Sequence, residues 1–398
     1  MKRHILILVE NLSVPFDRRV WQESRALVDG GHQVTVICPQ GSATDTAPEE
    51  TIDGVRILRY PLRAATGGPA GYLREYGLAL WHTTRLALRV RRHERIDAVH
   101  ACNPPDLLFL VGLLLKLLGA KAFVFDHHDL VPELFESRFG GRNWLYRATR
   151  AVERVTFATA DGVISTNESY RSVAIERGKM SPDAVRVVRS APDLDRFVMR
   201  TPDSALAQGK KHLVAYLGVM GPQDGVDYAI RALKYLRAEI GRDDVHAIFM
   251  GAGDALDEMI ALTADLGLDD MVEFTGRVPD EYVQTCLSTA DVCLSPDPLN
   301  PLNNLSTMNK VVEYMAMGRP LVSFDLVEAR VSAGDAAVYV PANDEAAFAE
   351  ALNELLDNPE RRAEMGTLGR SRVESQLSWA TSQHNLLEFY EDLFTRTS

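Results

Sequence analysis

The sequence is poor in cysteine and lacks a dinucleotide-binding fingerprint, and these two absences exclude several classes of protein. The four cysteines lie far apart in 398 residues, with no CxxC pair and no ligand spacing with histidine: Cys38, Cys102, Cys286 and Cys293. We therefore expect neither a disulfide framework nor a zinc site, and a reducing compartment fits. The loop at residues 10–17 has no GxGxxG, which removes most of the support for a nicotinamide-dependent oxidoreductase.

Long hydrophobic runs are also missing. The most apolar stretch, residues 107–118, contains Lys116 and is shorter than the roughly 20 apolar residues that span a bilayer. Residues 1–9 resemble a strand rather than a signal peptide, because a polar loop without a cleavage site follows them. The sequence predicts a cytoplasmic protein with a buried helix at 107–118.

Charge is distributed unevenly between the two halves of the chain. Residues 1–200 carry 28 Lys and Arg against 23 Asp and Glu, whereas residues 201–398 carry 15 against 32. Many N-terminal cations form two groups: Arg85, Arg89, Arg91, Arg92 and Arg95, then Arg138, Arg142, Arg147, Arg150 and Arg154. These groups fit contact with an anionic membrane or an anionic acceptor, but solvated helix faces give the same pattern. We expect no nucleic-acid partner.

Short apolar segments alternate with helical patterns along most of the chain. Residues 5–9, 18–28 and 34–38 make the first βαβ pattern, and a second series of such patterns begins after a polar stretch at residues 201–211. This alternation is typical of parallel sheets with helices on both faces. The sequence therefore predicts an α/β protein with two doubly wound domains.

We place these domains at residues 1–200 and 201–378, with a C-terminal helix at 379–398. In such folds the ligand binds at the carboxyl ends of the strands, so we expect it in the cleft between the domains.

Two clusters of titratable residues follow predicted strands of the N-terminal half, the first after residues 5–9 and the second after residues 122–125. Arg18 and Arg19 occupy the first turn of a helix that Asp17 can cap, although a helix dipole disfavours cations there. Either the phosphate of a substrate compensates them, or they pair with Asp17, Glu10 or Glu23.

The second cluster is Asp126-His127-His128-Asp129, which ends the strand at residues 122–125. Adjacent residues of a strand point to opposite sides, so they do not converge on a metal. We expect instead one histidine that a carboxylate orients.

In the second domain, three strand ends carry glycines, and backbone N–H groups at such ends can bind a diphosphate. The glycines are Gly218 and Gly221, then Gly251 and Gly253, then Gly276, which Arg277 follows.

A helix that begins near Asn309 places Lys310 and Glu313 three residues apart on one face. Lys310 suits a diphosphate and Glu313 suits a ribose diol, although a simple ion pair between the two is the alternative.

Four segments resemble the family 4 glycosyltransferases of the GT-B fold: RALVDGGHQVTVICP (25–39), FDHHDLVPE (125–133), TGRVP (275–279) and VVEYMAMGRP (311–320). The resemblance implies two Rossmann-like domains that face each other across a cleft and a C-terminal helix that crosses back to the first domain. It also implies metal-independent sugar transfer from a nucleotide diphosphate sugar, with retention of configuration.

By position, His128 matches the histidine beside the donor sugar, Glu313 the carboxylate on the ribose, and Gly218 the glycine beneath the diphosphate. The chain departs from the family in two places. Val219 and Asp224 stand where an Arg and a Lys are usual, and Leu305 stands where the first of two glutamates is usual.

Substitutes for the missing groups are present. We assign Lys310 and Arg277 to the phosphates. The remaining assignments are catalysis for His128 and Asp129; acceptor or phosphate contacts for Arg18, Arg19 and Asn103; donor binding for Asn309; and sugar contacts for Asp297, Asn303 and Asn304. Asp193-Leu194-Asp195 has the DxD pattern of metal-dependent glycosyltransferases, but it lies far from the nucleotide segment, and we expect no metal.

The resemblance thus predicts a retaining glycosyltransferase that uses no cofactor and acts on a saccharide or lipid-linked acceptor, with a UDP-sugar as the favoured donor. Its setting would be polysaccharide or glycolipid synthesis in the cytoplasm or at the inner membrane face. A sugar-nucleotide epimerase and a non-catalytic sugar-nucleotide-binding subunit are the alternatives.

Overall fold

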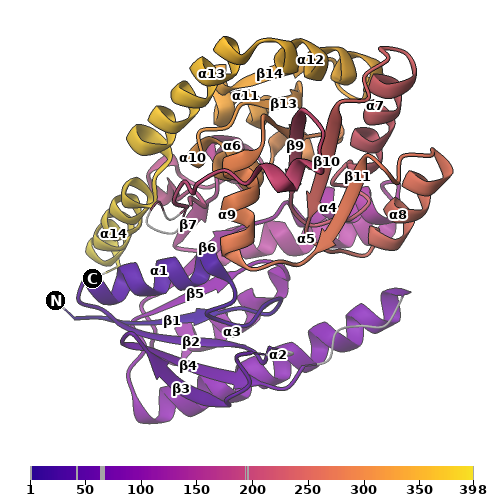
Figure 1. The fold of residues 1–398 in the computed structure, drawn as a ribbon. Coiled ribbons are helices and arrows are strands. Elements are labelled where there is room, and N and C mark those ends of the chain that lie inside the picture. The colour runs from indigo at the N-terminus through magenta and orange to yellow at the C-terminus, as the bar shows by residue number, and fades with distance from the viewer. Residues whose placement is uncertain (1, 42–43, 63–67, 193, 195–196, 398) are drawn as a thin grey trace. The chain divides into compact units, whose positions relative to one another are not determined.

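The computed structural model describes residues 2–41, 44–62, 68–192, 194 and 197–397 (Figure 1). The chain divides into two compact units: an N-terminal unit, Met1–Ser190 with Ala380–Ser398, and a C-terminal unit, Ala191–Trp379. The first boundary lies ten residues before the predicted position at 200. Each unit contains a parallel sheet with helices on both faces, so the predicted α/β class with two doubly wound sheets is confirmed.

The sheet of the N-terminal unit has the order β3-β4-β2-β1-β5-β6-β7-β8, and all its neighbours are parallel except β3 and β4. The strands are β1 (His4–Leu8), β2 (Gln33–Pro39), β3 (Glu49–Ile52), β4 (Val55–Tyr60), β5 (Ala98–Cys102), β6 (Ala122–His127), β7 (Gly162–Ser165) and β8 (Val185–Val187). The helices are α1 (Arg18–Asp29), α2 (Gly68–His93), α3 (Phe109–Leu117), α4 (Val131–Phe139), α5 (Trp144–Thr159), α6 (Glu168–Glu176) and α14 (Trp379–Arg396). β1 pairs with β2 on one side and β5 on the other, so the strand order reverses there. Ligands of doubly wound folds bind at such a reversal, at the carboxyl ends of the strands.

The sheet of the C-terminal unit has the order β11-β10-β9-β12-β13-β14 and is parallel throughout. The strands are β9 (His212–Leu217), β10 (Val245–Met250), β11 (Val272–Gly276), β12 (Val292–Ser295), β13 (Leu321–Phe324) and β14 (Ala337–Val340). The helices are α7 (Val226–Ala238), α8 (Leu256–Asp265), α9 (Asp280–Thr289), α10 (Asn309–Ala316), α11 (Val327–Ala333), α12 (Glu345–Asp357) and α13 (Pro359–Arg372). Here the strand order reverses between β9 and β12.

α14 ends the chain and packs, from Ala380 onward, on the N-terminal unit. Its buried face repeats at helical spacing and consists of Leu386, Phe389, Tyr390, Leu393 and Phe394. The Phe389 ring lies so close to Gly162 of β7 that a Cβ on this glycine would come within 2.7 Å of it. Arg186 of β8 donates to Asp392 at 2.8 Å. The helix therefore covers one face of the N-terminal sheet.

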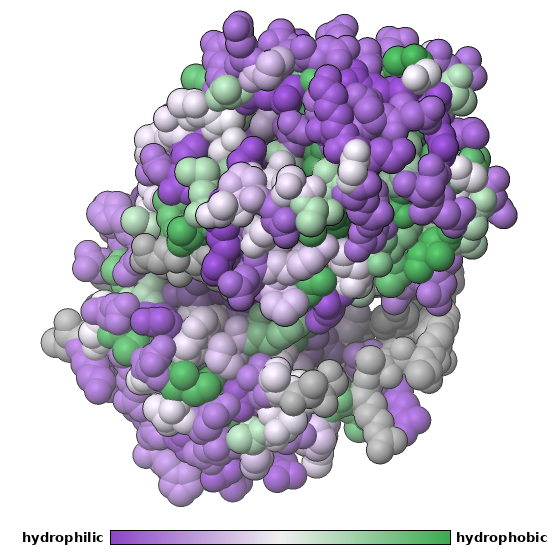
Figure 2. Space-filling model, viewed as in Figure 1, coloured by the Kyte–Doolittle hydropathy of each residue, from purple (hydrophilic) through white to green (hydrophobic). Residues whose placement is uncertain are grey.

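Most of the face drawn in Figure 2 is hydrophilic, and hydrophobic residues form scattered patches on it. Within the described ranges, no helix is both long and apolar enough to cross a membrane. The helix predicted to be buried at residues 107–118 is only half buried. In α3, Val111 and Leu115 pack inward, whereas Leu113 and Leu117 are exposed. The long apolar run thus covers both a core face and a solvent face.

We expect Phe389→Ala to lower the free energy of unfolding of the N-terminal unit by about 3–5 kcal/mol, because it opens a cavity between α14 and β7. Urea denaturation followed by tryptophan fluorescence measures this change, since Trp21, Trp81 and Trp144 all lie in that unit. Leu368→Ala on α13, at an exposed position, is the control and should change little. A loss below about 1 kcal/mol for Phe389→Ala would contradict this packing.

Candidate active site

The last residues of β6 alternate between two faces of the N-terminal sheet. His127 faces the aromatic rings of Phe157 and Tyr170 and is fully buried. Burial, with a further contribution from Arg177, lowers the pKa of His127 to about 3, so this ring is neutral. His127 is therefore a core residue, and the charged and hydrogen-bonded side chains lie on the other face of the sheet.

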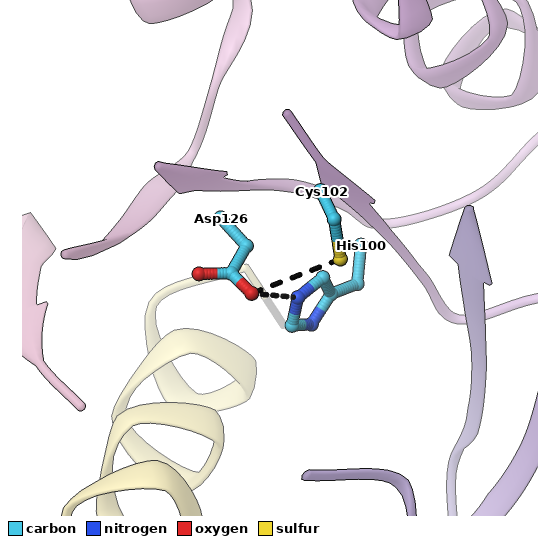
Figure 3. Close-up of side chains that lie close together, drawn as sticks. All are labelled: His100, Cys102 and Asp126. Atoms are coloured by element: carbon cyan, nitrogen blue, oxygen red, sulfur yellow. Dashed lines mark hydrogen bonds and ion pairs between the residues drawn. The ribbon is translucent and has the colours of Figure 1, made fainter. Parts of the chain in front are cut away.

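On that other face Asp126 is the centre of a buried polar network. It is fully buried, and its carboxylate accepts hydrogen bonds from Arg19 at 3.0 Å, from His100 at 3.0 Å and from His128 at 2.5 Å. Figure 3 shows His100 and Cys102 of β5 pointing toward Asp126. Burial alone would raise the pKa of Asp126, but Arg19 and the two histidines hold it well below its ordinary value. Asp126 is therefore an anion inside the fold.

Arg19 supplies the balancing positive charge. Its guanidinium lies 2.9 Å from Glu23 and donates to the Val188 carbonyl at 2.8 Å. Burial raises the pKa of Glu23 well above its ordinary value, so this neighbour is neutral. Arg19 was predicted to bind the acceptor or a phosphate. The structure favours the alternative, pairing within the protein: Asp126 is the ionised partner and Glu23 lies beside it, while Arg18 is exposed.

Two groups in this network have donor atoms close enough to hold a metal: His100, Cys102 and Asp126, and Glu23, Asp126 and His128. The chemistry of both sets fits a metal poorly. Burial raises the pKa of the Cys102 thiol well above its ordinary value, and a protonated thiol is a weak ligand. Arg19 already places a cation on Asp126. The ion pair between Arg19 and Asp126 therefore explains why these side chains lie close together.

Asn103 was assigned to the acceptor, but its side chain fixes the backbone of the loop after β6. Its Oδ1 accepts from the backbone N–H groups of His128 and Asp129, at 2.6 and 3.0 Å. Its Nδ2 donates to Asp106 and to the carbonyl of Asp129. Since Asn103 is buried, it positions His128 and Asp129 rather than a ligand.

In the C-terminal unit, the glycine-bearing strand ends lie against one another. The Gly218 N–H donates to the carbonyl of Met250, and the Gly251 N–H donates to that of Gly276. Gly251 has φ of +138°, and a Cβ there would lie 1.8 Å from the Gly218 carbonyl oxygen. Gly253 has a similarly close neighbour in the Met220 backbone. Only glycine allows these loops to approach so closely.

The N–H of Gly221 already has a protein acceptor, because it donates to the Asp224 carboxylate at 2.9 Å. Asp224 stands where the related family has a cation. A negative side chain thus occupies one of the backbone donors predicted to bind a diphosphate.

Lys310 and Asp297 form a buried ion pair near the point where the strand order reverses. Lys310 Nζ lies 2.6 Å from Asp297 Oδ1 and 4.9 Å from the centre of the Tyr216 ring. Burial would lower the pKa of Lys310, but Asp297 and Tyr216 raise it, so the cation persists. The alternative prediction paired Lys310 with Glu313, whereas the carboxylate that lies on Lys310 is that of Asp297. Two residues assigned to the phosphate and the sugar instead bind each other.

The remaining predicted ligands fall into two classes. Asn303 is buried and donates to the carbonyls of Gln223 and Pro298, while Asn304 accepts from the Val327 N–H. Both asparagines therefore hold loops. Arg277 and Asn309 are exposed, and Glu313 is partly exposed on α10. These three remain accessible to a ligand.

Four residues that contact His128 or Lys310 directly or through a neighbour were not assigned to the site from the sequence. They are His100, Tyr390, Tyr216 and Asp126. Alternation along β5 and β6 would have placed His100 and Asp126 on one face. The contact of Tyr390 with His100 joins residues 290 positions apart, and local patterns contain no signal for it. Asp193 and Asp195, the DxD pattern, lie outside the described residues.

Comparison with known proteins identifies two family models. "Glycosyl transferase 4-like domain" matches residues 17–191, and "Glycosyl transferases group 1" matches residues 211–358. The chain is 28% identical to alpha-maltose-1-phosphate synthase of Mycolicibacterium smegmatis, over 71% of this chain and 76% of that protein. It is 26% identical to a GDP-mannose-dependent alpha-(1-6)-phosphatidylinositol monomannoside mannosyltransferase of the same organism, over 90% of both chains.

Solved structures show the same fold. Sucrose-phosphate synthase from Thermosynechococcus elongatus superimposes with a TM-score of 0.81 at 20% identity, over 99% of this chain and all of that one. HepE of Anabaena, solved in complex with UDP-glucose, has a TM-score of 0.72 at 16% identity, over 98% of this chain and 99% of that one.

We expect Asp297→Asn to destabilise the C-terminal unit by about 3–5 kcal/mol, because it leaves the buried Lys310 cation without a counter-charge. Adding Lys310→Met should restore most of this stability. Denaturant titrations followed by circular dichroism measure both variants. Asp325→Asn removes a solvent-exposed ion pair with Arg330 and should have little effect. An equally small effect of Asp297→Asn would show that Lys310 carries no buried charge.

Proposed function

Because the chain belongs to the family 4-like glycosyltransferases of the GT-B fold, we propose that it transfers a sugar from a nucleotide diphosphate sugar to a saccharide or lipid-linked acceptor. We propose further that the transfer retains the anomeric configuration and needs no metal. The observation that carries this proposal is the segment around α10, where Glu313 is partly exposed and the neighbouring Tyr314 hydroxyl accepts from the Leu217 N–H, next to Gly218.

The donor would bind to the C-terminal unit. Glu313 is suited to accept the two hydroxyls of a ribose. Since Asp297 neutralises Lys310, the diphosphate would rely on Arg277 and on the first backbone N–H groups of α10, where Asn309 begins the helix. The relatives differ in donor, since one is named as GDP-mannose-dependent and a neighbour binds UDP-glucose. We favour a UDP-sugar.

The proposed reaction is a front-face displacement. The bond between the anomeric carbon and the phosphate oxygen breaks while the acceptor oxygen bonds to that carbon from the same side. The leaving phosphate takes the acceptor proton, so the protein needs no strong base and contributes orientation and charge stabilisation. His128 would hydrogen-bond the donor sugar.

The first experiment is calorimetry with UDP-, GDP-, ADP- and TDP-sugars, followed by NMR of the product formed with a saccharide acceptor. We expect one donor to bind equally well with and without EDTA. Glu313→Ala should weaken that binding about tenfold or more, through the lost ribose hydrogen bonds. Glu281→Ala, at an exposed position of α9, is the control and should bind as the wild type does.

Other outcomes of this experiment favour the alternatives. Conversion of the donor to its epimer without an acceptor would indicate an epimerase. Binding without any turnover would indicate a non-catalytic subunit, and loss of binding in EDTA would contradict metal independence.

We also propose that the N-terminal unit contacts anionic membranes through α2 and α3, which pack against each other. The exposed hydrophobic residues of this surface are Leu78 and Trp81 of α2, and Leu110, Leu113, Leu117 and Leu118 in and after α3. Arg85 lies over the Trp81 ring, and Arg91 donates to the Leu118 carbonyl. Exposed apolar side chains beside arginines are typical of surfaces that insert shallowly into anionic lipid.

The double variant Trp81→Ser/Leu117→Ser tests this surface by sedimentation with vesicles that contain phosphatidylglycerol. We expect its binding to fall about tenfold or more, since two exposed apolar side chains are lost. Leu368→Ser is the control, because Leu368 is 46% exposed on α13 of the C-terminal unit. Equal binding of all three proteins, or binding that does not depend on the anionic lipid, would exclude the contact.

A further inference from the structure

The buried network around Asp126 links His128 to the C-terminal helix. Asp126 Oδ2 lies 2.5 Å from Nε2 of His128 and 3.0 Å from Nε2 of His100. On the far side of the His100 ring, Nδ1 lies 2.7 Å from the hydroxyl of Tyr390 in α14. Three side chains thus connect α14 to the loop that carries His128.

The protons in this network follow from the charge of Asp126. An ionised carboxylate can only accept hydrogen bonds, so both Nε2 atoms must carry hydrogen and donate to it. The Nδ1 atom of His100 is then an acceptor, and the Tyr390 hydroxyl donates to it. With the His128 proton on Nε2, Nδ1 is the nitrogen left to accept a hydrogen bond.

One further contact needs a choice between two arrangements. Arg19 Nε lies 2.9 Å from His128 Nε2 with its N–H directed at that nitrogen, so the competing arrangement is a hydrogen bond from Arg19 to an unprotonated Nε2. The lone pair of Nε2 would then face the Asp126 oxygen at 2.5 Å, which is repulsive. The charge-assisted bond to Asp126 therefore prevails.

We propose that Asp126, supported by His100 and Tyr390, is the positioning residue that fixes His128 with its proton on Nε2 and leaves Nδ1 to accept a hydrogen bond from the substrate. This inference rests on the proposed sugar transfer, in which a hydroxyl of the donor sugar or of the acceptor would donate to Nδ1. A carboxylate that fixes a histidine tautomer in this way controls which ring nitrogen meets the ligand.

The variant that tests this role is Asp126→Asn. Its amide can present N–H to the His128 ring, which favours the tautomer with the proton on Nδ1. We expect kcat to fall about 100-fold or more, while the Kd of the free nucleoside diphosphate, which the C-terminal unit would bind, stays within twofold. NMR of ¹⁵N-labelled histidine should show His128 protonated on Nε2 in the wild type and on Nδ1 in the variant.

If Asp126→Asn does not fold, two measurements still test the inference. They are the tautomer of His128 in the wild type and the kcat of a second variant. Tyr390→Phe removes only the hydroxyl on His100, and we expect it to lower kcat about threefold to tenfold. Tyr60→Phe, which removes a buried hydroxyl that donates to the Val9 carbonyl, is the matched control and should stay within twofold.

Two results would overturn the inference: a wild-type His128 with its proton on Nδ1, or a folded Asp126→Asn variant with kcat within twofold of the wild type. Failure of the proposed function is a separate result. If the wild type transfers no sugar, the glycosyltransfer proposal fails, while the tautomer measurement still decides what Asp126 does to His128.

Discussion

The ion pair between Arg19 and Asp126 is the interaction on which the N-terminal unit depends. Asp126 lies near the end of a central strand and is fully buried, where an isolated carboxylate would be very costly. Arg19 offsets this cost from the first turn of α1, and its Nη1 donates to the Val188 carbonyl after β8. The pair therefore joins β6, α1 and the end of the unit, and it keeps an anion in contact with His128. Without that anion nothing would fix the protonation of the His128 ring.

The C-terminal unit uses the same device at its own carboxyl edge. Lys310 and Asp297 balance each other in the interior beside Tyr216. Such a pair fixes the start of α10 relative to β9 and the loop after β12, and so it sets where Glu313 points. In both units a cation that the sequence suggests for a phosphate instead neutralises a buried carboxylate.

Local sequence patterns were sufficient to predict the two-sheet architecture and most of its strands, because apolar periodicity reports backbone geometry directly. The strands β3 and β4 were not predicted. The same patterns also located His128 and the α10 segment. They could not predict the roles of Arg19, Asn103 and Asn303, since a polar side chain at a strand end can turn toward solvent or toward the core. That choice depends on partners such as Asp126 and Gln223, which only the folded chain brings near.

The charge balance at the C-terminal edge bears on how a donor is held. Lys310 contributes one positive charge, and Asp297 and Asp224 contribute two negative ones, so these three side chains have a net charge of −1. A diphosphate placed there would meet repulsion unless other groups compensate for it. Arg277 and the N-terminus of α10 offer that compensation, but a helix terminus carries only about half a charge. Under the proposed function, binding of the nucleoside and the sugar would then matter more for affinity than the phosphates, and Glu313 would be the main side chain that recognises the donor.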